Sequence, residues 1–198
     1  SSRGTVLYLD PRGKAAAFAA EGDGTALAKA GYAVMAVDVS GSGEVAFARS
    51  ESAPWGSAQL AWLALMVGRP LLGIRMHDVV RGLDAIGELG RMPAAGVTLI
   101  AKGKLGAVAL HAAVIDTRIS RVIVEDSLIS YAAVGATPVH RDIEELVVPG
   151  ALASYDLPDL AAAIGPRSVR VTNPRSPVGR QLLRREAESV YGPVSNAK

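Results

Sequence analysis

Five short apolar runs alternate with helical patterns along this chain. The runs are Thr5–Leu9, Tyr32–Val39, Val97–Ala101, Arg121–Glu125 and Val169–Thr172. The helical patterns that separate them are Thr25–Ala30, Leu71–Leu89, Lys104–Ile115 and Leu157–Ile164. Strands that alternate with helices form parallel sheets, and the helices cover the faces of the sheet. The sequence therefore predicts a three-layer α/β/α domain with a doubly wound, mostly parallel sheet of about five strands.

The composition fits one domain of this kind. Of the 198 residues, 49% are hydrophobic and 20% are charged, so the chain can bury a substantial core but is too short for two full-sized domains. We interpret residues 1–198 as a single domain that belongs to a longer multidomain protein. The 21 Lys and Arg residues nearly balance the 19 Asp and Glu residues, without a basic run that would indicate nucleic-acid binding. No apolar run reaches the ~18 residues of a membrane span.

Residue types that bind metals and cofactors are scarce. The chain has no cysteine, and its three histidines, His77, His111 and His140, lack the spacing of metal ligands. The glycines of Gly41–Gly43 match the start of a dinucleotide fingerprint, but a helix does not follow them directly, as that motif requires. We expect neither a metal nor a cofactor.

Two stretches between the predicted elements have loop-like sequences. Ser40–Gly56 is rich in Gly, Ser and Ala, and Tyr131–Ala153 contains two prolines and a glycine near its end. Beyond the fifth run, Gly179–Tyr191 is predicted to be helical. The helical pattern Leu71–Leu89 has one apolar face. Charged residues on its other side are interpreted as a solvated surface: Arg75, Asp78, Arg81, Asp84 and Glu88.

Polar residues follow several of the predicted strands. Because the carboxyl ends of parallel strands meet at one edge of a sheet, ligands bind there. The cations expected at this edge, as an anion or ligand site, are Arg12, Lys14, Lys102 and Lys104. Lys102 and Lys104 flank the start of a helix, which disfavours each of them by up to ~1 kcal/mol. They either form an anion pocket with the helix amides or pair with Glu125 or Asp126, and we favour the ion pairs.

The segment from Val97 to Gly106 reads VTLIAKGKLG, an apolar strand that runs through a tight turn into an alanine-rich helix. The nucleophile elbow, G-x-S-x-G, has the same strand–turn–helix course. Here the three motif positions are Ala101, Gly103 and Leu105, so a glycine stands where the serine would be. We predict that Gly103 lies in the turn, with Ala101 ending the strand, because glycine adopts the strained elbow backbone without cost.

Several segments, in this order, resemble α/β-hydrolases of the acetyl xylan esterase or dienelactone-hydrolase-like kind. Leu7–Ala16 is similar to the strand and loop that supply an oxyanion donor, and Gly31–Glu44 is similar to the motif G-x-x-V-x-x-x-D-x-R-G-x-G, with Ser40 in place of the arginine. Arg75–Ile86 is similar to the helix before the elbow, and Leu110–Ser127 is similar to the elbow helix and the next strand. The resemblance implies a truncated α/β-hydrolase fold with carboxylic-ester hydrolase ancestry. It also implies a lid over Tyr131–Ala153.

The catalytic residues that the resemblance implies are missing from their places. The nucleophile position holds Gly103, the turn after the fifth run offers Ser176 but no carboxylate, and no histidine follows. Ester hydrolysis by a nucleophile needs a hydroxyl or thiol, a base and a third group that orients the base. We therefore interpret the chain as a catalytically degenerate α/β-hydrolase-like domain. It would be an accessory or structural part of an esterase-like protein that acts on acylated carbohydrate.

Two alternatives stay open. One is an active carboxylic-ester hydrolase with a relocated site, in which Ser40, Ser42 or Ser127 acts with His140 and Asp126. The other is a flavodoxin-like domain that binds a small ligand, because both folds share the strand order 2-1-3-4-5. The expected partners are a companion hydrolase domain and an acylated carbohydrate, with no nucleic acid and no membrane. Export would follow if the domain belongs to a protein that acts on polysaccharides.

Overall fold

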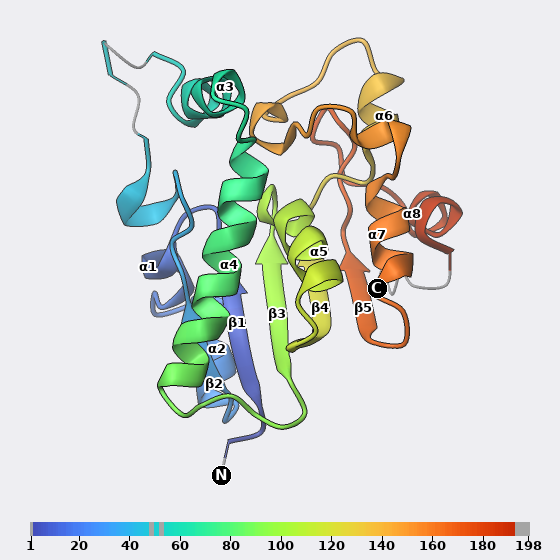
Figure 1. Cartoon of the computed structure of the whole chain (residues 1–198). Helices are drawn as coiled ribbons and strands as arrows, with labels where there is room; N and C mark the ends of the chain where they lie inside the picture. Colours follow the sequence, from blue (N-terminus) through green and yellow to red (C-terminus); the bar gives the residue numbers. More distant parts are fainter. Residues whose placement is uncertain (1, 48–49, 52–53, 193–198) are drawn as a thin grey trace.

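One parallel sheet organises the chain. The computed structural model describes residues 2–47, 50–51 and 54–192. Its strands are β1 (Thr5–Leu9), β2 (Ala33–Ala36), β3 (Val97–Lys102), β4 (Ile119–Glu125) and β5 (Ser168–Thr172). They lie in the order β2-β1-β3-β4-β5, and every neighbouring pair is parallel (Figure 1). Each predicted run coincides with a strand, which confirms the predicted fold class. Strand β2 ends at Ala36 and is therefore shorter than the predicted run Tyr32–Val39.

The larger core lies between the sheet and the helices α4 (Leu71–Glu88), α5 (Leu105–Ile115) and α7 (Leu157–Ala163), in front of the sheet in Figure 1. Helix α8 (Arg184–Tyr191) packs beside α7. Side chains alternate along β1, so that Leu7 and Leu9 enter this core while their neighbours face the other side. Fully buried Leu83 and Val108 meet them from α4 and α5.

The opposite face of the sheet has a smaller core. Helices α1 (Lys14–Ala17) and α2 (Asp23–Lys29) lie against β1 and β2 on this side. Val6, Tyr8 and Ile100 are buried here. The third layer of the predicted sandwich is therefore thin, and it covers the β2 side of the sheet more than the β5 side.

Helix α3 (Ser57–Met66) was not predicted. It contains no charged residue and so lacks the polar face that marks an amphipathic helix. Met66 is 82% exposed, and Trp62 and Leu63 are also exposed. Within the described ranges no single helix is long and apolar enough to cross a membrane. Together α3 and α4 pass the same test by length and composition, although they are bent by 100°.

The predicted lid, residues 131–153, contains short helices. They are α6 (Tyr131–Gly135), η2 (Glu144–Leu146) and η3 (Ala151–Ala153). A further short 3-10 helix, η1 (Gly43–Val45), lies in the loop that follows β2. The lid sits at the end of the sheet where the strands finish, next to α3 (Figure 1). The lid therefore covers the edge at which a ligand would bind.

Arg75 corrects one expectation about α4. The sequence placed it on a solvated face, but its side chain is fully buried. The first part of α4 contacts both α3 and η2. A position that faces solvent in an isolated helix is therefore covered here by the lid.

Candidate functional site

Gly103 lies in the turn between β3 and α5, as predicted. The strand runs one residue past Ala101, and α5 begins at Leu105. Gly103 has φ of +53°, and its N–H donates to the Glu125 carbonyl at 2.8 Å. A Cβ atom added at Gly103 would meet only the Cγ of Pro11, at 3.5 Å, which is an ordinary contact. The turn thus has the course of a nucleophile elbow and space for a side chain, but it carries no hydroxyl.

The loop that follows β1 faces this turn. In α/β-hydrolases the oxyanion hole combines the N–H of the residue after the nucleophile with an N–H from such a loop. Pro11, which faces Gly103, has no N–H to donate. The next three N–H groups already have acceptors: Arg12 donates to Asp10 Oδ1 at 2.8 Å, Gly13 to the Asp10 carbonyl at 2.9 Å and Lys14 to Asp38 Oδ1 at 2.5 Å. The 11–14 segment therefore has no N–H available for an oxyanion.

Arg12 and Lys14 are held in ion pairs rather than left to face a ligand. The Arg12 guanidinium lies 2.7 Å from Asp10, and Lys14 lies 3.0 Å from Asp38 and 2.7 Å from Glu44. Burial alone would raise the pKa of Asp10, but hydrogen bonds from Arg12 outweigh burial and hold this pKa below its ordinary value. Both cations thus stabilise the loops that follow β1 and β2.

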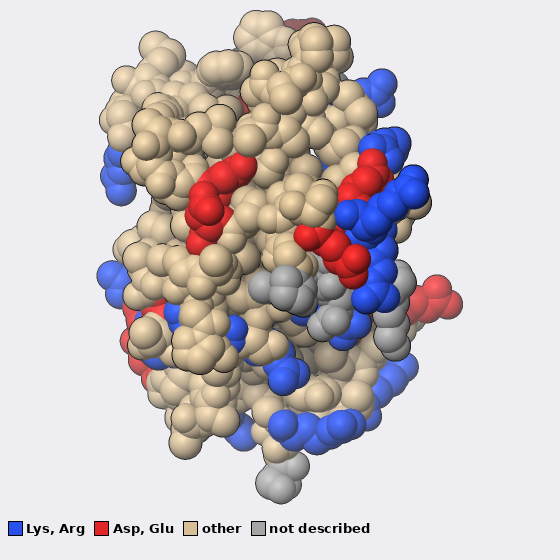
Figure 2. All heavy atoms as spheres, turned by 90° about the vertical axis from the view of Figure 1, so that its right-hand side faces the viewer, with Lys and Arg blue, Asp and Glu red and all other residues tan. Residues whose placement is uncertain are grey.

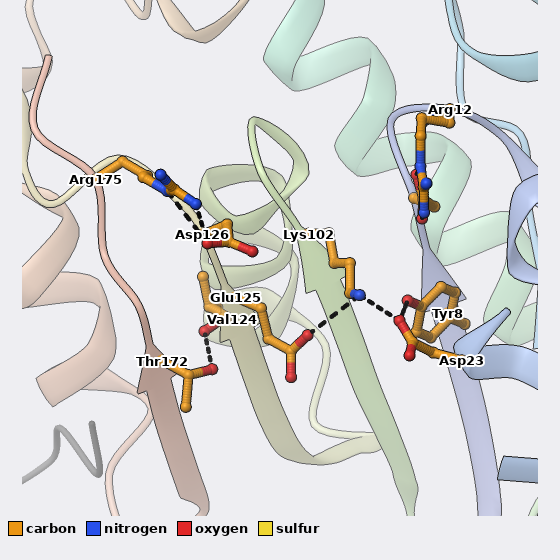
Figure 3. A network of polar contacts seen from close by, with 10 residues as sticks. Tyr8, Arg12, Asp23, Lys102, Val124, Glu125, Asp126, Thr172 and Arg175 are labelled. Carbon is orange, nitrogen blue, oxygen red and sulfur yellow. Dashed lines mark hydrogen bonds and ion pairs between the residues drawn. The ribbon is translucent and has the colours of Figure 1, made fainter. Parts of the chain in front are cut away.

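Lys102 points toward the α2 face of the sheet. Its ammonium pairs with Asp23 and lies 3.6 Å from Glu125, as Figure 3 shows. The Tyr8 hydroxyl donates to the same Asp23 carboxylate at 2.9 Å, and burial, with this bond, raises the pKa of Tyr8. The expected partner Glu125 is present, while Asp23 was not foreseen.

Lys104 points instead toward the lid. Its Nζ lies 2.5 Å from Glu145 Oε1, so the expected pairing of Lys104 with Glu125 or Asp126 was wrong. Glu145 is only 5% exposed. It also accepts from Ser57 Oγ at 2.5 Å and pairs with Arg75 Nη2 at 2.5 Å. We call Arg75, Lys104, Glu145 and Ser57 the buried ion cluster.

Two cations share one carboxylate in the buried ion cluster. Burial alone would raise the pKa of Glu145, but the charges of Arg75 and Lys104 and the hydrogen bonds from Lys104 and Ser57 lower it. Arg75 Nε donates to the Ser40 carbonyl at 2.8 Å, whereas its Nη1 has no hydrogen-bond partner among the described residues. The cluster therefore joins the lid to α3, to α4 and to the elbow turn.

Asp126, a candidate acid, is paired with a cation. It follows β4 with φ of +54°. Arg175, which follows β5, contacts Asp126 Oδ1 with Nη2 at 2.7 Å and Nε at 3.1 Å (Figure 3). This pair joins the ends of the two strands.

A cavity of about 530 Å³ lies over the elbow. We call it the polar cavity, and its lining includes Pro11, Ser57, Gly103, Lys104, Asp126, Arg141, Asp142, Glu145 and Arg175–Gly179. The lid closes against the turn after β5, because the Arg141 N–H donates to the Pro177 carbonyl at 2.9 Å. The polar cavity occupies the position expected for a hydrolase active site, and it contains charged groups of both signs.

The residues of the relocated-site alternative are not brought together. Ser42 and Ser127 are buried, and the Ser42 hydroxyl donates to a backbone carbonyl at 2.7 Å. None of Ser40, Ser42 and Ser127 lines the polar cavity. His140 is exposed, and none of the three hydroxyls is hydrogen-bonded to it within the described part of the chain. That part also holds no group of three His, Asp or Glu side chains placed to bind a metal.

Sequence reasoning missed Glu145, Arg141 and Arg175. Arg175 sits in the turn after the fifth run, so its position after a strand was a usable signal. Glu145 and Arg141 lie in a loop-like stretch that showed no pattern. Only the packing of the lid onto α3 and β5 brings them to the strand ends.

Neither a model of a known protein family nor a curated protein sequence matches the chain. Solved structures do. A Bacteroides fragilis protein assigned as an acetyl xylan esterase superposes with a TM-score of 0.73 at 16% identity, over 100% of this chain and 58% of that chain. An esterase from Pyrococcus furiosus superposes with a TM-score of 0.58 at 14% sequence identity, over 100% of this chain and 72% of that chain. A glucuronoyl esterase from Solibacter usitatus superposes with a TM-score of 0.54 at 16% sequence identity, over 96% of this chain and 60% of that chain.

The chain spans 58% of the length of the Bacteroides structure and 60% of that of the glucuronoyl esterase. At these sequence identities the similarity concerns the fold. The chain therefore has the α/β-hydrolase fold, in a form similar to that of acetyl xylan esterases.

Proposed function

We propose that the chain is a catalytically degenerate α/β-hydrolase domain, an accessory or structural part of an esterase-like protein that acts on acylated carbohydrate. The elbow carries this proposal. Gly103 lies in a strand-to-helix turn that resembles a nucleophile elbow, and it supplies no hydroxyl. Loss of a triad nucleophile removes most of the rate of a serine hydrolase.

The loop after β1 supports the proposal independently. Its amides are either absent, at Pro11, or already bonded within the chain, at Arg12, Gly13 and Lys14. Removal of one oxyanion-hole donor lowers kcat by about 10²–10³ in a serine protease. A domain that lacks both the nucleophile and this donor is not expected to hydrolyse esters.

The accessory role has two supports. The structural neighbours include carbohydrate esterases. Helix α3 also leaves Trp62, Leu63 and Met66 exposed. Adjacent exposed apolar side chains mark interaction surfaces, and a companion hydrolase domain is the partner that this role requires.

Hydrolysis of 4-nitrophenyl acetate and release of acetate from acetylated xylan test the proposal. The chain is expected to give a rate that is linear in substrate and no higher than that of serum albumin. Ser40→Ala, Ser42→Ala and Ser127→Ala are expected to leave this rate unchanged. Saturable turnover that one of these variants abolishes would contradict the degenerate domain and establish the relocated serine site.

A further inference from the structure

A second hollow lies within the lid. Its volume is about 310 Å³, and its walls include Tyr131 and Val134 of α6, Leu146 of η2 and Ala151 of η3. We call it the lid cavity. Tyr131 supplies the one polar side chain of the described lining, and its hydroxyl already donates to the Leu146 carbonyl at 3.1 Å. The lid cavity is therefore apolar.

The surrounding sequence has the same character. Residues 128–139 and 146–155 contain no charged side chain. The end of the molecule that carries the lid is largely free of charge in Figure 2, whereas Lys, Arg, Asp and Glu side chains gather lower on the same face. An apolar group that enters the lid cavity would not have to displace a charge.

The lid cavity adjoins the polar cavity. Leu128, Ile143 and Leu146 line both of them. The space over Gly103 therefore has two compartments side by side, one with charged groups and one without. Ligand sites in proteins commonly combine an apolar pocket with a few polar groups that fix the orientation of the ligand.

The size of the lid cavity limits what fills it well. An apolar cavity of roughly 150 Å³ already holds a benzene molecule, so 310 Å³ is about twice that space. The lid cavity opens to solvent, since Leu152 in its lining is 54% exposed. An acetyl group, with two carbon atoms, would leave most of the lid cavity unfilled. An acyl chain with more carbon atoms than the six of benzene, such as octanoyl, suits it better.

We propose that the lid cavity binds a medium-chain acyl group such as octanoyl, carried by a carbohydrate ester whose sugar lies in the polar cavity. The carbohydrate part rests on the function proposed above. Arg141 and Asp142 line the polar cavity and form no ion pair within the described part of the chain. A guanidinium and a carboxylate together can donate to and accept from sugar hydroxyls. The ester is held beside Gly103 and is not cleaved.

Calorimetric titration with matched esters tests the inference. The probes are 6-O-octanoyl-D-glucose, below its critical micelle concentration, 6-O-acetyl-D-glucose and octanoate alone. The octanoyl ester is expected to bind at least tenfold more tightly than the acetyl ester, because only the octanoyl chain fills the lid cavity. It is also expected to bind at least tenfold more tightly than octanoate, which lacks the sugar.

Variants of α6 locate the acyl group. Val134→Trp places a large side chain in the lining, and Gly135→Trp does so at a position where an added Cβ meets nothing within 4 Å. Each is expected to reduce the preference for octanoyl over acetyl at least tenfold. Ala132→Trp is the control, because Ala132 is exposed on the same helix and does not line the lid cavity.

The outcomes separate this inference from the proposed function. Equal affinity for the two esters overturns the inference, as does an octanoyl preference that persists in both filled variants with circular dichroism unchanged. Octanoate that binds as tightly as its ester overturns the placement of the sugar in the polar cavity. Tight binding followed by release of octanoate supports the acyl site but contradicts the degenerate domain. Tight binding without release supports both.

Discussion

Gly103 combines a backbone conformation that favours glycine with free space around the position of a side chain. Gly106, three residues on, is different. A Cβ atom there would lie 2.4 Å from both the Ser127 Oγ and a methyl group of Val124, because the start of α5 packs closely on the end of β4. One glycine is therefore required by packing, while the other could carry a small side chain at a backbone cost.

Gly103→Ser is expected to fold, to lose about 1–2 kcal/mol of unfolding free energy to its left-handed backbone, and to hydrolyse no ester. A serine alone lacks both a base and the second oxyanion donor. Urea denaturation and the nitrophenyl acetate assay measure the two effects. Gly106→Ser is the control and is expected to lose more stability than Gly103→Ser. Ester hydrolysis that Gly103→Ser raises a hundredfold would mean that a base and the donors are in place.

Glu145→Gln is expected to lower the unfolding free energy at pH 7 by about 3–5 kcal/mol, because Arg75 is then buried without a counter-charge. The neighbouring Glu144, which is half-buried and forms no ion pair within the described residues, gives the control, and Glu144→Gln is expected to stay within about 0.5 kcal/mol of the original. Urea denaturation of the three proteins checks both values. A loss at Glu145 no larger than that at Glu144 would contradict the buried ion cluster.

The same variant has a defined pH dependence. The pKa of Glu145 is lower in the folded chain than its ordinary value of 4.5, so its stabilising contribution is fully present above pH 4.5. That contribution is lost as the pH falls from there through the lowered pKa of the folded state. The difference in unfolding free energy between the original chain and Glu145→Gln is therefore expected to shrink as the pH falls below about 4.5. A difference in unfolding free energy that grows on acidification would contradict a lowered pKa of Glu145.

At the scale of elements, the β3–α5 turn joins both sides of the sheet. Lys102 contacts α2 on one face, and Lys104 contacts the lid beyond the strand ends. Lys102 has partly exposed partners, since the side chain of Asp23 is 51% exposed. The carboxylate that Lys104 contacts is almost fully buried. We therefore expect Lys104 to contribute more to the unfolding free energy than Lys102 does.

Lys102→Met is expected to change the unfolding free energy by less than about 1 kcal/mol, as exposed ion pairs do. Lys104→Met is expected to cost about 1.5–3 kcal/mol, because a buried carboxylate loses a charged hydrogen-bond donor. Thermal or urea unfolding of the two variants under the same conditions makes the comparison. Equal losses, or a larger loss at Lys102, would mean that the lid is not fastened through Lys104.

At the scale of the whole molecule, the sheet could be predicted from the sequence because its strands are buried runs of apolar residues. Leu7, Leu9 and Leu99 belong to continuous apolar stretches, as parallel strands covered by helices require. The turn at Gly103 could also be predicted, because glycine readily adopts the positive φ that such a turn needs. The order of the elements then determined which residues meet at the strand ends.

The contacts that the lid makes could not be predicted in this way. Arg75 has the spacing of a solvated helix residue, and its burial depends on Glu145 from a segment far along the chain. Helix α3 lacks a polar face, so its periodicity carried no signal. The polar cavity and the lid cavity both form where these segments pack together. Local patterns in the sequence do not encode such long-range packing.

Labelling with a fluorophosphonate probe tests the central claim most directly, because the probe forms a covalent bond only with an activated serine. Intact-mass spectrometry is expected to show the unmodified chain after prolonged incubation, while an active esterase in the same tube is labelled completely. Stoichiometric labelling of the chain, located by peptide mapping at Ser40, Ser42 or Ser127, would contradict the account.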